Sequence, residues 1–281
     1  MACSLSCSLE QKPNAMKNLA LLLILICSVN GYAFEGVAAR QNQQTTFRKI
    51  KNESFKAGEK LVYKVHYGLV DAGFATLEVK ETTKNINGRK LLHVVGKGKS
   101  ISAFDLFFKV RDRYESYIDQ EGMFPWIFIR RVYEGGFEIK QDYTFYQHKK
   151  KVITGKDKLD VPANVQDMLS SFYYARTIDF SNAKIDDEFE INCVVDGETW
   201  PLKIKYKGED VVKIKKGKFN CLKFAPVLQE GRIWENEEDL TVWITNDQNK
   251  IPLLAKTKIL VGSIKMELCE YEGLAGPISK I

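Results

Sequence analysis

Cysteine is scarce in this 281-residue chain, and half of its six cysteines lie in the first 33 residues. The remaining three, Cys193, Cys221 and Cys269, are widely spaced and include no C-x-x-C pair. An odd number at such spacing argues against both a disulfide framework and a zinc site. The sequence therefore predicts small buried thiols, with a single Cys193–Cys221 disulfide left open as the alternative.

Recognisable catalytic motifs are also lacking. The three histidines never lie within four residues of one another, so no H-E-x-x-H motif exists. Gly98-Lys99-Ser100 imitates the end of a phosphate-binding loop, but His93 stands where the first glycine belongs. Ser181 and Lys184 match S-x-x-K without the companion motifs of that class. The sequence predicts no catalytic residues, no metal site and no cofactor, and it favours a non-enzymatic protein.

Long blocks of like charge are missing as well. The net charge is +6, and no run of five or more residues of one sign occurs. The longest basic cluster, Lys149–Lys151, is typical of a solvated turn. A nucleic-acid partner is therefore not supported.

The one long apolar run lies at the beginning of the chain. Residues 19–29 form an 11-residue apolar stretch behind Lys17, too short to span a bilayer, which needs about 20 residues. Gly31 and Ala33 supply the small residues of a cleavage site. We predict a signal peptide over 1–33, with Met16 as the true start and 1–15 a mis-called leader. Cys27 follows Ile26 where a lipoprotein needs a small residue, so the predicted location is the periplasm, without lipidation and without a transmembrane segment after cleavage.

The rest of the chain reads as nearly all β. Leu61, Tyr63, Val65 and Tyr67 stand at alternate positions, with Lys64 and His66 on the opposite face. Residues 69–73 have the composition of a turn, and apolar residues resume the alternation through Val79. This pattern predicts an antiparallel hairpin with one apolar face. We expect a flexible lead-in over 34–53, one β-rich domain over 54–274 and a tail over 275–281.

Further strands fall into two groups. The first group follows the hairpin: 90–97, 104–118, 123–133 and 137–147. The second group is predicted at 188–195, 200–206, 211–215, 219–227, 231–234, 239–245, 251–259 and 263–272. The expected fold is mainly β, a curved antiparallel sheet or half-open barrel in two strand groups.

One helix is expected between the groups, at about 163–178. Val165, Met168, Leu169, Phe172 and Tyr173 recur at helical spacing, behind Pro162 and a capping pair at Asn164 and Asp167. We predict that this stripe packs against the sheet, whereas Ser170 and Ser171 face away from it and tolerate alanine.

Aromatic residues exceed what a lean sheet needs. They could simply pack the core, or some of them could line the mouth of a cavity for an apolar ligand. Phe104, Phe107 and Phe108 occur in a break between strands, where core packing demands little. The candidate ligand-binding residues are therefore Phe104, Phe107, Phe108, Trp126 and Phe128.

Three motifs in order resemble a known family. They are GEKLVYKVHYGLVDAG at 58–73, DMLSSFYYAR at 167–176 and WITNDQNKIP at 243–252. Together they are similar to an exported bacterial family known only as domain of unknown function 3108, over about 55–272. The resemblance implies a Gram-negative envelope protein without an established activity, and it supplies no catalytic residues. By fold analogy it implies a lipoprotein-carrier type of sheet around an apolar cavity.

Two functions of different classes are therefore expected. The first is a periplasmic module that binds or carries an apolar or lipid-like molecule. The second is a solid-cored envelope protein that docks a protein partner through strand edges or aromatic loops. A hydrolase is the least favoured class. An internal cavity of several hundred Å³ or more, the size of usual ligand pockets, would favour the first function.

Overall fold

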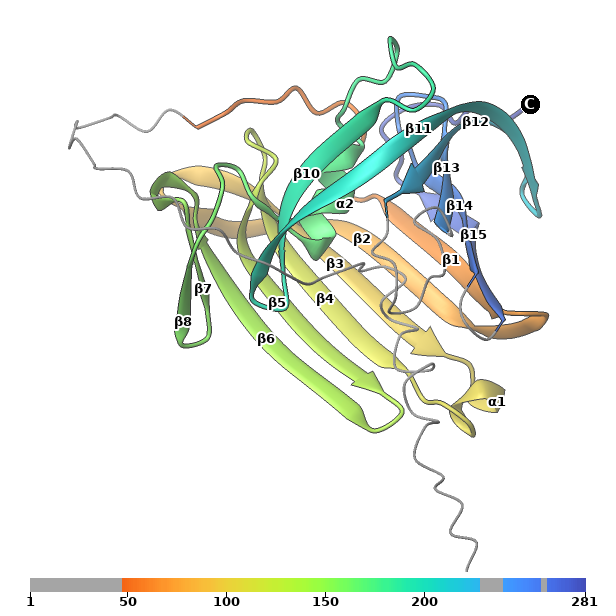
Figure 1. Ribbon diagram of the computed structural model, residues 1–281, viewed down its shortest axis with the longest axis horizontal. Helices are drawn as coiled ribbons and strands as arrows, with labels where there is room; N and C mark the ends of the chain where they lie inside the picture. The colour runs from red at the N-terminus through yellow and green to blue at the C-terminus, as the bar shows by residue number, and fades with distance from the viewer. Residues whose placement is uncertain (1–46, 228–239, 259–261) are drawn as a thin grey trace, which may run out of the picture.

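The computed structural model describes residues 47–227, 240–258 and 262–281 (Figure 1). Within them, fifteen strands form one sheet in the order β8-β7-β6-β5-β4-β3-β2-β1-β15-β14-β13-β12-β11-β10-β9. The first strands are β1 (Lys60–Tyr67), β2 (Val70–Ile86), β3 (Arg89–Ser100), β4 (Arg111–Asp119), β5 (Pro125–Glu134), β6 (Phe137–Tyr146), β7 (Lys151–Thr154) and β8 (Asp157–Asp160). The others are β9 (Gln166–Asp167), β10 (Glu188–Val195), β11 (Glu198–Ile214), β12 (Gly217–Pro226), β13 (Leu240–Thr245), β14 (Pro252–Lys258) and β15 (Ser263–Glu272).

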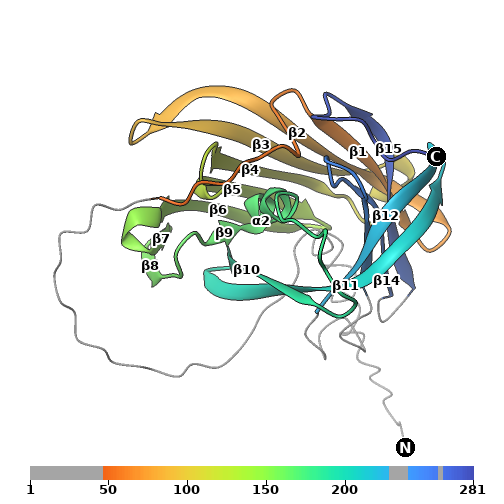
Figure 2. The same ribbon diagram turned by 90° about the horizontal axis from the view of Figure 1, so that it is seen from above.

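The order of the strands explains the two groups. Strands β1 to β8 add one after another toward one edge of the sheet, then the chain crosses to the opposite edge and β10 to β15 return until β15 pairs with β1. Every pair is antiparallel except β9 with β10. The sheet curls around helix α2 (Met168–Ala175), which lies on its concave side (Figure 2). The predicted curved antiparallel sheet with a helix packed against it is confirmed, and the two groups are halves of one sheet.

The hairpin at the start of the fold has the predicted apolar face. Leu61 and Tyr63 are buried and stand opposite Leu77 and Ala75 across the β1–β2 pair. Its turn is shorter than predicted, because Tyr67 already pairs with Val70. Gly68 adopts a φ of 57°, a left-handed conformation that glycine reaches without strain and that closes such a tight turn.

Helix α2 is shorter than the predicted 163–178. Gln166 and Asp167 are extended because they pair with Cys193 and Val194 of β10 as strand β9. The N-cap is therefore Asp167 and not Asn164. Its carboxylate accepts the backbone N–H groups of Leu169 and Ser170 at 2.8 and 2.7 Å. Tertiary pairing with β10 thus overrides the helical pattern upstream of residue 167.

The predicted exposed face of this helix is wrong. Ser170 and Ser171 are buried together with Met168, Leu169 and Tyr173, because the curled sheet packs around the helix. The hydroxyl of Ser170 accepts the backbone N–H of Asp167 at 2.8 Å, which completes a reciprocal capping box.

We expect Ser170→Ala to lower the free energy of unfolding by about 1–3 kcal/mol. The substitution leaves the buried N–H of Asp167 without its acceptor, and an unsatisfied buried donor costs about this much. Urea unfolding followed by circular dichroism measures the difference. Ser263→Ala, at an exposed position of β15, is the control and should stay within about 0.5 kcal/mol of the parent. Equal effects for both variants would contradict the capping role.

Two other element predictions need correction. Residues 104–118 are not one strand, because the short helix α1 (Ser102–Asp105) occupies the connection between β3 and β4. The segments 200–206 and 211–215 are one strand, β11, whose pairing register with β12 shifts between Tyr206 and Glu209. The strand predicted at 231–234 lies outside the described residues.

The ends of the domain are held more firmly than predicted. Residues 47–53, expected within a flexible lead-in, pack on the fold: Phe47 contacts the Trp126 ring and Arg48 donates to the carbonyls of Gly122 and Met123, both at 2.7 Å. The expected tail at 275–281 is also tied down, because the Ser279 N–H donates to Asp247 at 2.6 Å.

The three described cysteines are free thiols, so the alternative Cys193–Cys221 disulfide is not formed. Cys193 and Cys221 are buried in β10 and β12, and burial raises the pKa of each thiol to about 12. Thiols with such a pKa are poor nucleophiles at neutral pH. Their role is packing.

Candidate functional site

The candidate residues around helix α1 lie in different environments. The side chain of Phe107 is 80% exposed, next to Leu106 at 84%, and Phe104 is partly exposed. Phe108 is instead buried at 8% and lies against the β5–β6 turn, where a Cβ added to Gly135 would come within 2.2 Å of its ring. The structure therefore makes Phe107 a surface residue and Phe108 a packing residue.

Trp126 and Phe128 are core residues on β5. Trp126 is 2% exposed, clusters with Leu91 and Phe124, and donates its indole N–H to Asp119 at 3.0 Å. Phe128 is fully buried between Tyr114 and Tyr143. The structure does not bring the five candidate residues together around one cavity, so their binding role stays a prediction without geometric support.

The three sequence motifs do meet, at a buried ion pair. Arg176, the last residue of the second motif, donates from both Nη atoms to the carboxylate of Glu59 in the first motif, each at 2.7 Å. Its Nε donates to the carbonyl of Asn249 in the third motif at 2.9 Å. The rings of Phe55 and Tyr173 lie 5.2 and 5.3 Å from its guanidinium carbon. We call this cluster the arginine hub.

The third motif supplies a structured turn next to the hub. Asp247 accepts the backbone N–H groups of Asn249 and Lys250 at 2.8 and 3.2 Å, and the Thr245 hydroxyl at 3.0 Å. The amide of Asn249 donates to the carbonyl of Pro277 at 2.9 Å. This 246–250 turn is therefore fixed on both sides, and it holds Lys250 at a φ of 46°.

An apolar pocket lies between α2 and the second strand group. Its volume is about 190 Å³. The helix contributes Phe172 and Ala175, and β13 contributes Val242 and Ile244. The complete lining is Met168, Ser171, Phe172, Ala175, Arg176, Phe180, Ile191, Leu202, Ile204, Phe224, Pro226, Leu240, Val242, Ile244, Lys250 and Pro252. This apolar pocket is smaller than the several hundred Å³ that the sequence-based criterion required, so it would seat only part of a ligand of usual size.

Two charged side chains line the apolar pocket. Arg176 is neutralised by Glu59 in the arginine hub. Lys250 is partly buried, and loss of solvent around its ammonium group lowers its pKa, an effect that Asp179 and Asp247 partly oppose. The pocket therefore combines apolar walls with one cationic group.

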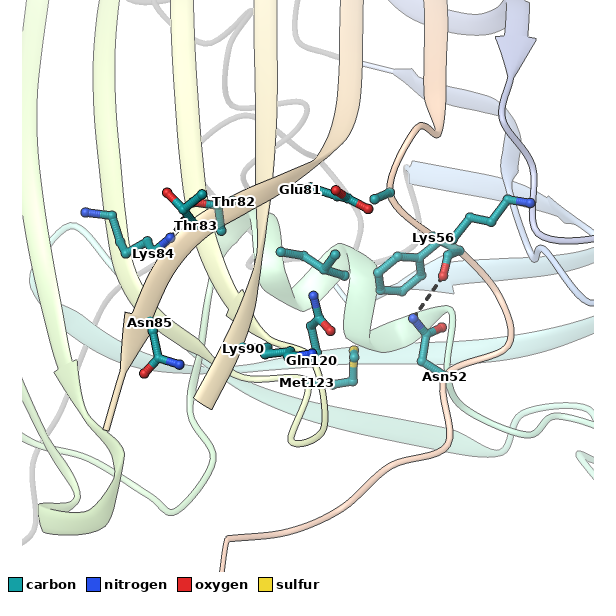
Figure 3. A pocket seen from close by; sticks show the side chains of 13 residues that line it. Asn52, Lys56, Glu81, Thr82, Thr83, Lys84, Asn85, Lys90, Gln120 and Met123 are labelled. Carbon is teal, nitrogen blue, oxygen red and sulfur yellow. Dashed lines mark hydrogen bonds between the residues drawn. The ribbon is translucent and has the colours of Figure 1, made fainter. Parts of the chain in front are cut away.

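A larger and more polar groove lies where the end of β2 and the start of β3 approach residues 52–57 (Figure 3). Its volume is about 870 Å³. Lys56, Lys84 and Lys90 contribute positive charge, whereas Glu81 is the acidic residue of its lining. Phe55, Leu92 and Met123 form its apolar part. Its lining contains the hydroxyl groups of Thr82 and Thr83 but no histidine, cysteine or serine.

A second charge cluster, only partly buried, joins the two strand groups. Arg130 of β5 pairs with Asp196, in the β10–β11 turn, at 2.7 Å. Nearby Asp112 is buried, and burial raises the pKa of this carboxyl to about 6. Its Oδ1 accepts the backbone N–H of Tyr133 at 3.1 Å, which ties β4 to β5. These contacts are structural ties between strands.

The described residues contain neither a metal-binding cluster nor a membrane-spanning helix. Within 47–227, 240–258 and 262–281, no three histidine, cysteine or acidic side chains gather closely enough to hold an ion. In the same ranges no helix has the length and apolar character that crossing a bilayer requires.

Sequence reasoning missed Arg176, Glu59, Asn249 and Lys250. Each of them lies within a quoted motif, but Arg176 is 117 residues from Glu59 and 73 from Asn249, so no local spacing indicates these contacts. One signal could have indicated these residues. Each motif contains a charged or amide residue among apolar positions, and such a residue needs a buried partner if it lies in the core.

Known proteins give a family and a fold. A search of curated protein sequences finds no match. Among solved structures, the chain is similar to a beta-barrel-like protein of domain of unknown function DUF1849 from Brucella abortus, with a TM-score of 0.51 and 11% identity over 81% of this chain and 99% of that one. At that identity the likeness shows the fold alone. A second structure, the Mycobacterium tuberculosis lipoprotein LppX, aligns at 12% identity over 78% of this chain and 87% of that one, but its TM-score of 0.16 supports no inference.

The family itself is shown by a match over most of the domain. The family model described as "Protein of unknown function (DUF3108)" matches residues 62–268, from β1 to β15. This span contains two of the three motifs in full and most of the first. The chain belongs to the DUF3108 family.

Proposed function

We propose that this protein is a non-enzymatic binding protein that holds an apolar group of its ligand in the apolar pocket between α2 and β10–β14. The observation that carries the proposal is the pocket itself, because most of the residues that line it have apolar side chains. Apolar pockets of comparable volume bind small hydrocarbons in proteins. The rest of a lipid-like ligand would extend beyond the pocket.

The proposed location is the periplasm. The basis is the amino-acid pattern of residues 1–33, which is typical of a cleaved signal peptide. A binding protein outside the cytoplasm would carry or present its ligand without ATP, in agreement with the lack of a phosphate-binding loop in the sequence.

The pocket can be tested with N-phenyl-1-naphthylamine, an uncharged probe that fluoresces in apolar surroundings. We expect the parent protein to bind it and Val242→Trp to bind it about tenfold more weakly or worse, because the indole fills the space that the probe needs. Val242 is only partly buried, so the larger ring can be accommodated. A fluorescence titration with direct excitation of the probe measures both affinities.

The matched control is Val211→Trp, at an exposed position of β11 outside the pocket lining. This variant should bind the probe as the parent does. Unchanged binding by Val242→Trp would place the probe elsewhere, and a parent protein that does not bind it would refute the proposal.

A second function has one observation in its favour. Leu106 and Phe107 of the α1 connection are exposed, and so is Leu69 in the β1–β2 turn. The two segments are joined by a hydrogen bond from the Ile101 N–H to the Ala72 carbonyl at 3.0 Å. Exposed apolar side chains at one place can dock a protein partner. The probe titration separates the two functions, because docking through these tips needs no internal pocket.

A further inference from the structure

Lys250, a cation in the lining of the apolar pocket, forms no ion pair with any other described residue. Among the described residues, no acidic oxygen lies within ion-pair distance of the Lys250 ammonium group, although Lys250 lines the pocket and is only partly exposed. The guanidinium of Arg176, the other cation of the lining, donates hydrogen bonds to Glu59, Asn249 and Ser54. A partly desolvated ammonium group beside hydrocarbon is unfavourable unless an anion comes to it.

The acidic groups nearest to Lys250 are engaged elsewhere. Asp247 accepts hydrogen bonds from the Thr245 hydroxyl and from the backbone N–H groups of Asn249, Lys250 and Ser279. Asp179 accepts the backbone N–H of Ser181 at 2.9 Å. Glu53 influences the lysine only at longer range. None of the three closes an ion pair with it.

The position of Lys250 is fixed before any ligand arrives. Its backbone N–H is bound by Asp247, and the preceding residue, Asn249, is fully buried and holds the carbonyls of Gly276 and Pro277. The next residue, Ile251, is also fully buried. A charge mounted on a fixed backbone loses less entropy on binding than one on a free loop.

From this placement we infer that the ligand is an amphipathic anion: its alkyl chain enters the apolar pocket, and its carboxylate or phosphate pairs with Nζ of Lys250. The inference rests on the proposed function, because it names the ligand class for the same pocket. A fatty acid and a phosphate-bearing lipid share this chemistry.

Three ligands of one chain length test it on the folded protein: dodecanoate, dodecanol and dodecyltrimethylammonium. The two ionic ligands are used below their micelle concentrations and dodecanol below its solubility limit. Isothermal titration calorimetry measures their affinities directly. We expect dodecanoate to bind on the order of tenfold more tightly than dodecanol, and dodecyltrimethylammonium to bind most weakly, from the attraction of one partly buried ion pair. Dodecyl phosphate then distinguishes a phosphate head from a carboxylate.

Substitutions assign the effect to the lysine. Lys250→Gln should lower the affinity for dodecanoate about tenfold and affect that for dodecanol much less, so that the two affinities become similar. Lys250→Glu should reverse the preference in favour of dodecyltrimethylammonium. Asp179→Asn removes a nearby competing charge and should tighten dodecanoate binding. The control for Lys250→Gln is Lys158→Gln, which also removes one lysine charge but from an exposed position on β8. It should behave as the parent.

The pH dependence has a definite sign. The Lys250 pKa is lowered from its ordinary value, so the ammonium loses its proton at a lower pH than a solvated lysine. Dodecanoate affinity should therefore begin to fall at a lower pH than the ordinary lysine pKa of about 10.4 would predict, while that of Lys250→Gln stays level.

The outcomes separate this inference from the proposed function. Equal binding of dodecanoate and dodecanol, unaffected by Lys250→Gln, would overturn the anionic ligand while the apolar pocket stands. In that case, loss of dodecanol binding in Val242→Trp would confirm that the apolar pocket is the binding site. Failure of all three ligands and of N-phenyl-1-naphthylamine to bind the parent would overturn both.

Discussion

Glu59→Gln is expected to lower the free energy of unfolding by about 3–5 kcal/mol. The substitution keeps the shape of the side chain but removes the charge that faces Arg176, whose side chain is 2% exposed. A buried guanidinium without its carboxylate is an uncompensated buried charge, and breaking such a pair costs this much. The loss should spread beyond β1, because the arginine also holds the carbonyls of Ser54 and Asn249.

Urea unfolding followed by tryptophan fluorescence and by circular dichroism measures this cost. The control is Glu272→Gln, which removes the carboxylate of the exposed Lys60–Glu272 pair on the neighbouring strands and should cost no more than about 1 kcal/mol. Combining Glu59→Gln with Arg176→Met should cost less than the two single variants together, since the second change removes the stranded charge. A loss below about 1 kcal/mol for Glu59→Gln would show that the arginine hub is solvated or dispensable.

The second large effect is expected at Phe108. Phe108→Ala should lower the free energy of unfolding by about 3–5 kcal/mol, the usual cost of removing a buried ring. Its ring packs against the β5–β6 turn at Gly135, so its removal leaves a cavity between α1 and that turn. Thermal and urea unfolding measure the change.

The adjacent Phe107 is the matched control, because it has the same side chain at 80% exposure. Phe107→Ala should stay within about 0.5 kcal/mol of the parent. This pair also tests the cavity-mouth prediction: if both rings lined a mouth, both substitutions would be mild and both would reduce binding of N-phenyl-1-naphthylamine. We expect neither to change probe affinity at the apolar pocket, since neither residue lines it.

Much of the fold could be predicted because each strand carries its own pattern. Strands β10 and β15 have the predicted bounds, and the apolar face of the first hairpin lies where the alternation placed it. A sheet with one buried face imposes period two on the sequence, so this information is local. The helix was detected for the same reason, since Met168, Leu169 and Tyr173 recur at helical spacing.

The errors arose where a distant segment decided the conformation. Pairing with β10 made Gln166 and Asp167 a strand and delayed the start of α2. The curl of the sheet buried Ser170, although its polarity predicted exposure. Trp126 and Phe108 were candidates for ligand contact because aromatic character alone does not distinguish a core ring from a pocket ring.

The sequence by itself determined the mainly β architecture, the helix between two strand groups and the membership indicated by the three motifs. Only the tertiary structure showed that the three motifs contact one another in the arginine hub. Glu59, Arg176 and Asn249 come from three separate regions, and their contacts exist only once the sheet has closed around α2. The same folding places Lys250 at an apolar pocket, because the walls of that pocket belong to helix α2 and to strands β10 to β14, which lie far apart in the sequence and meet only in the folded sheet.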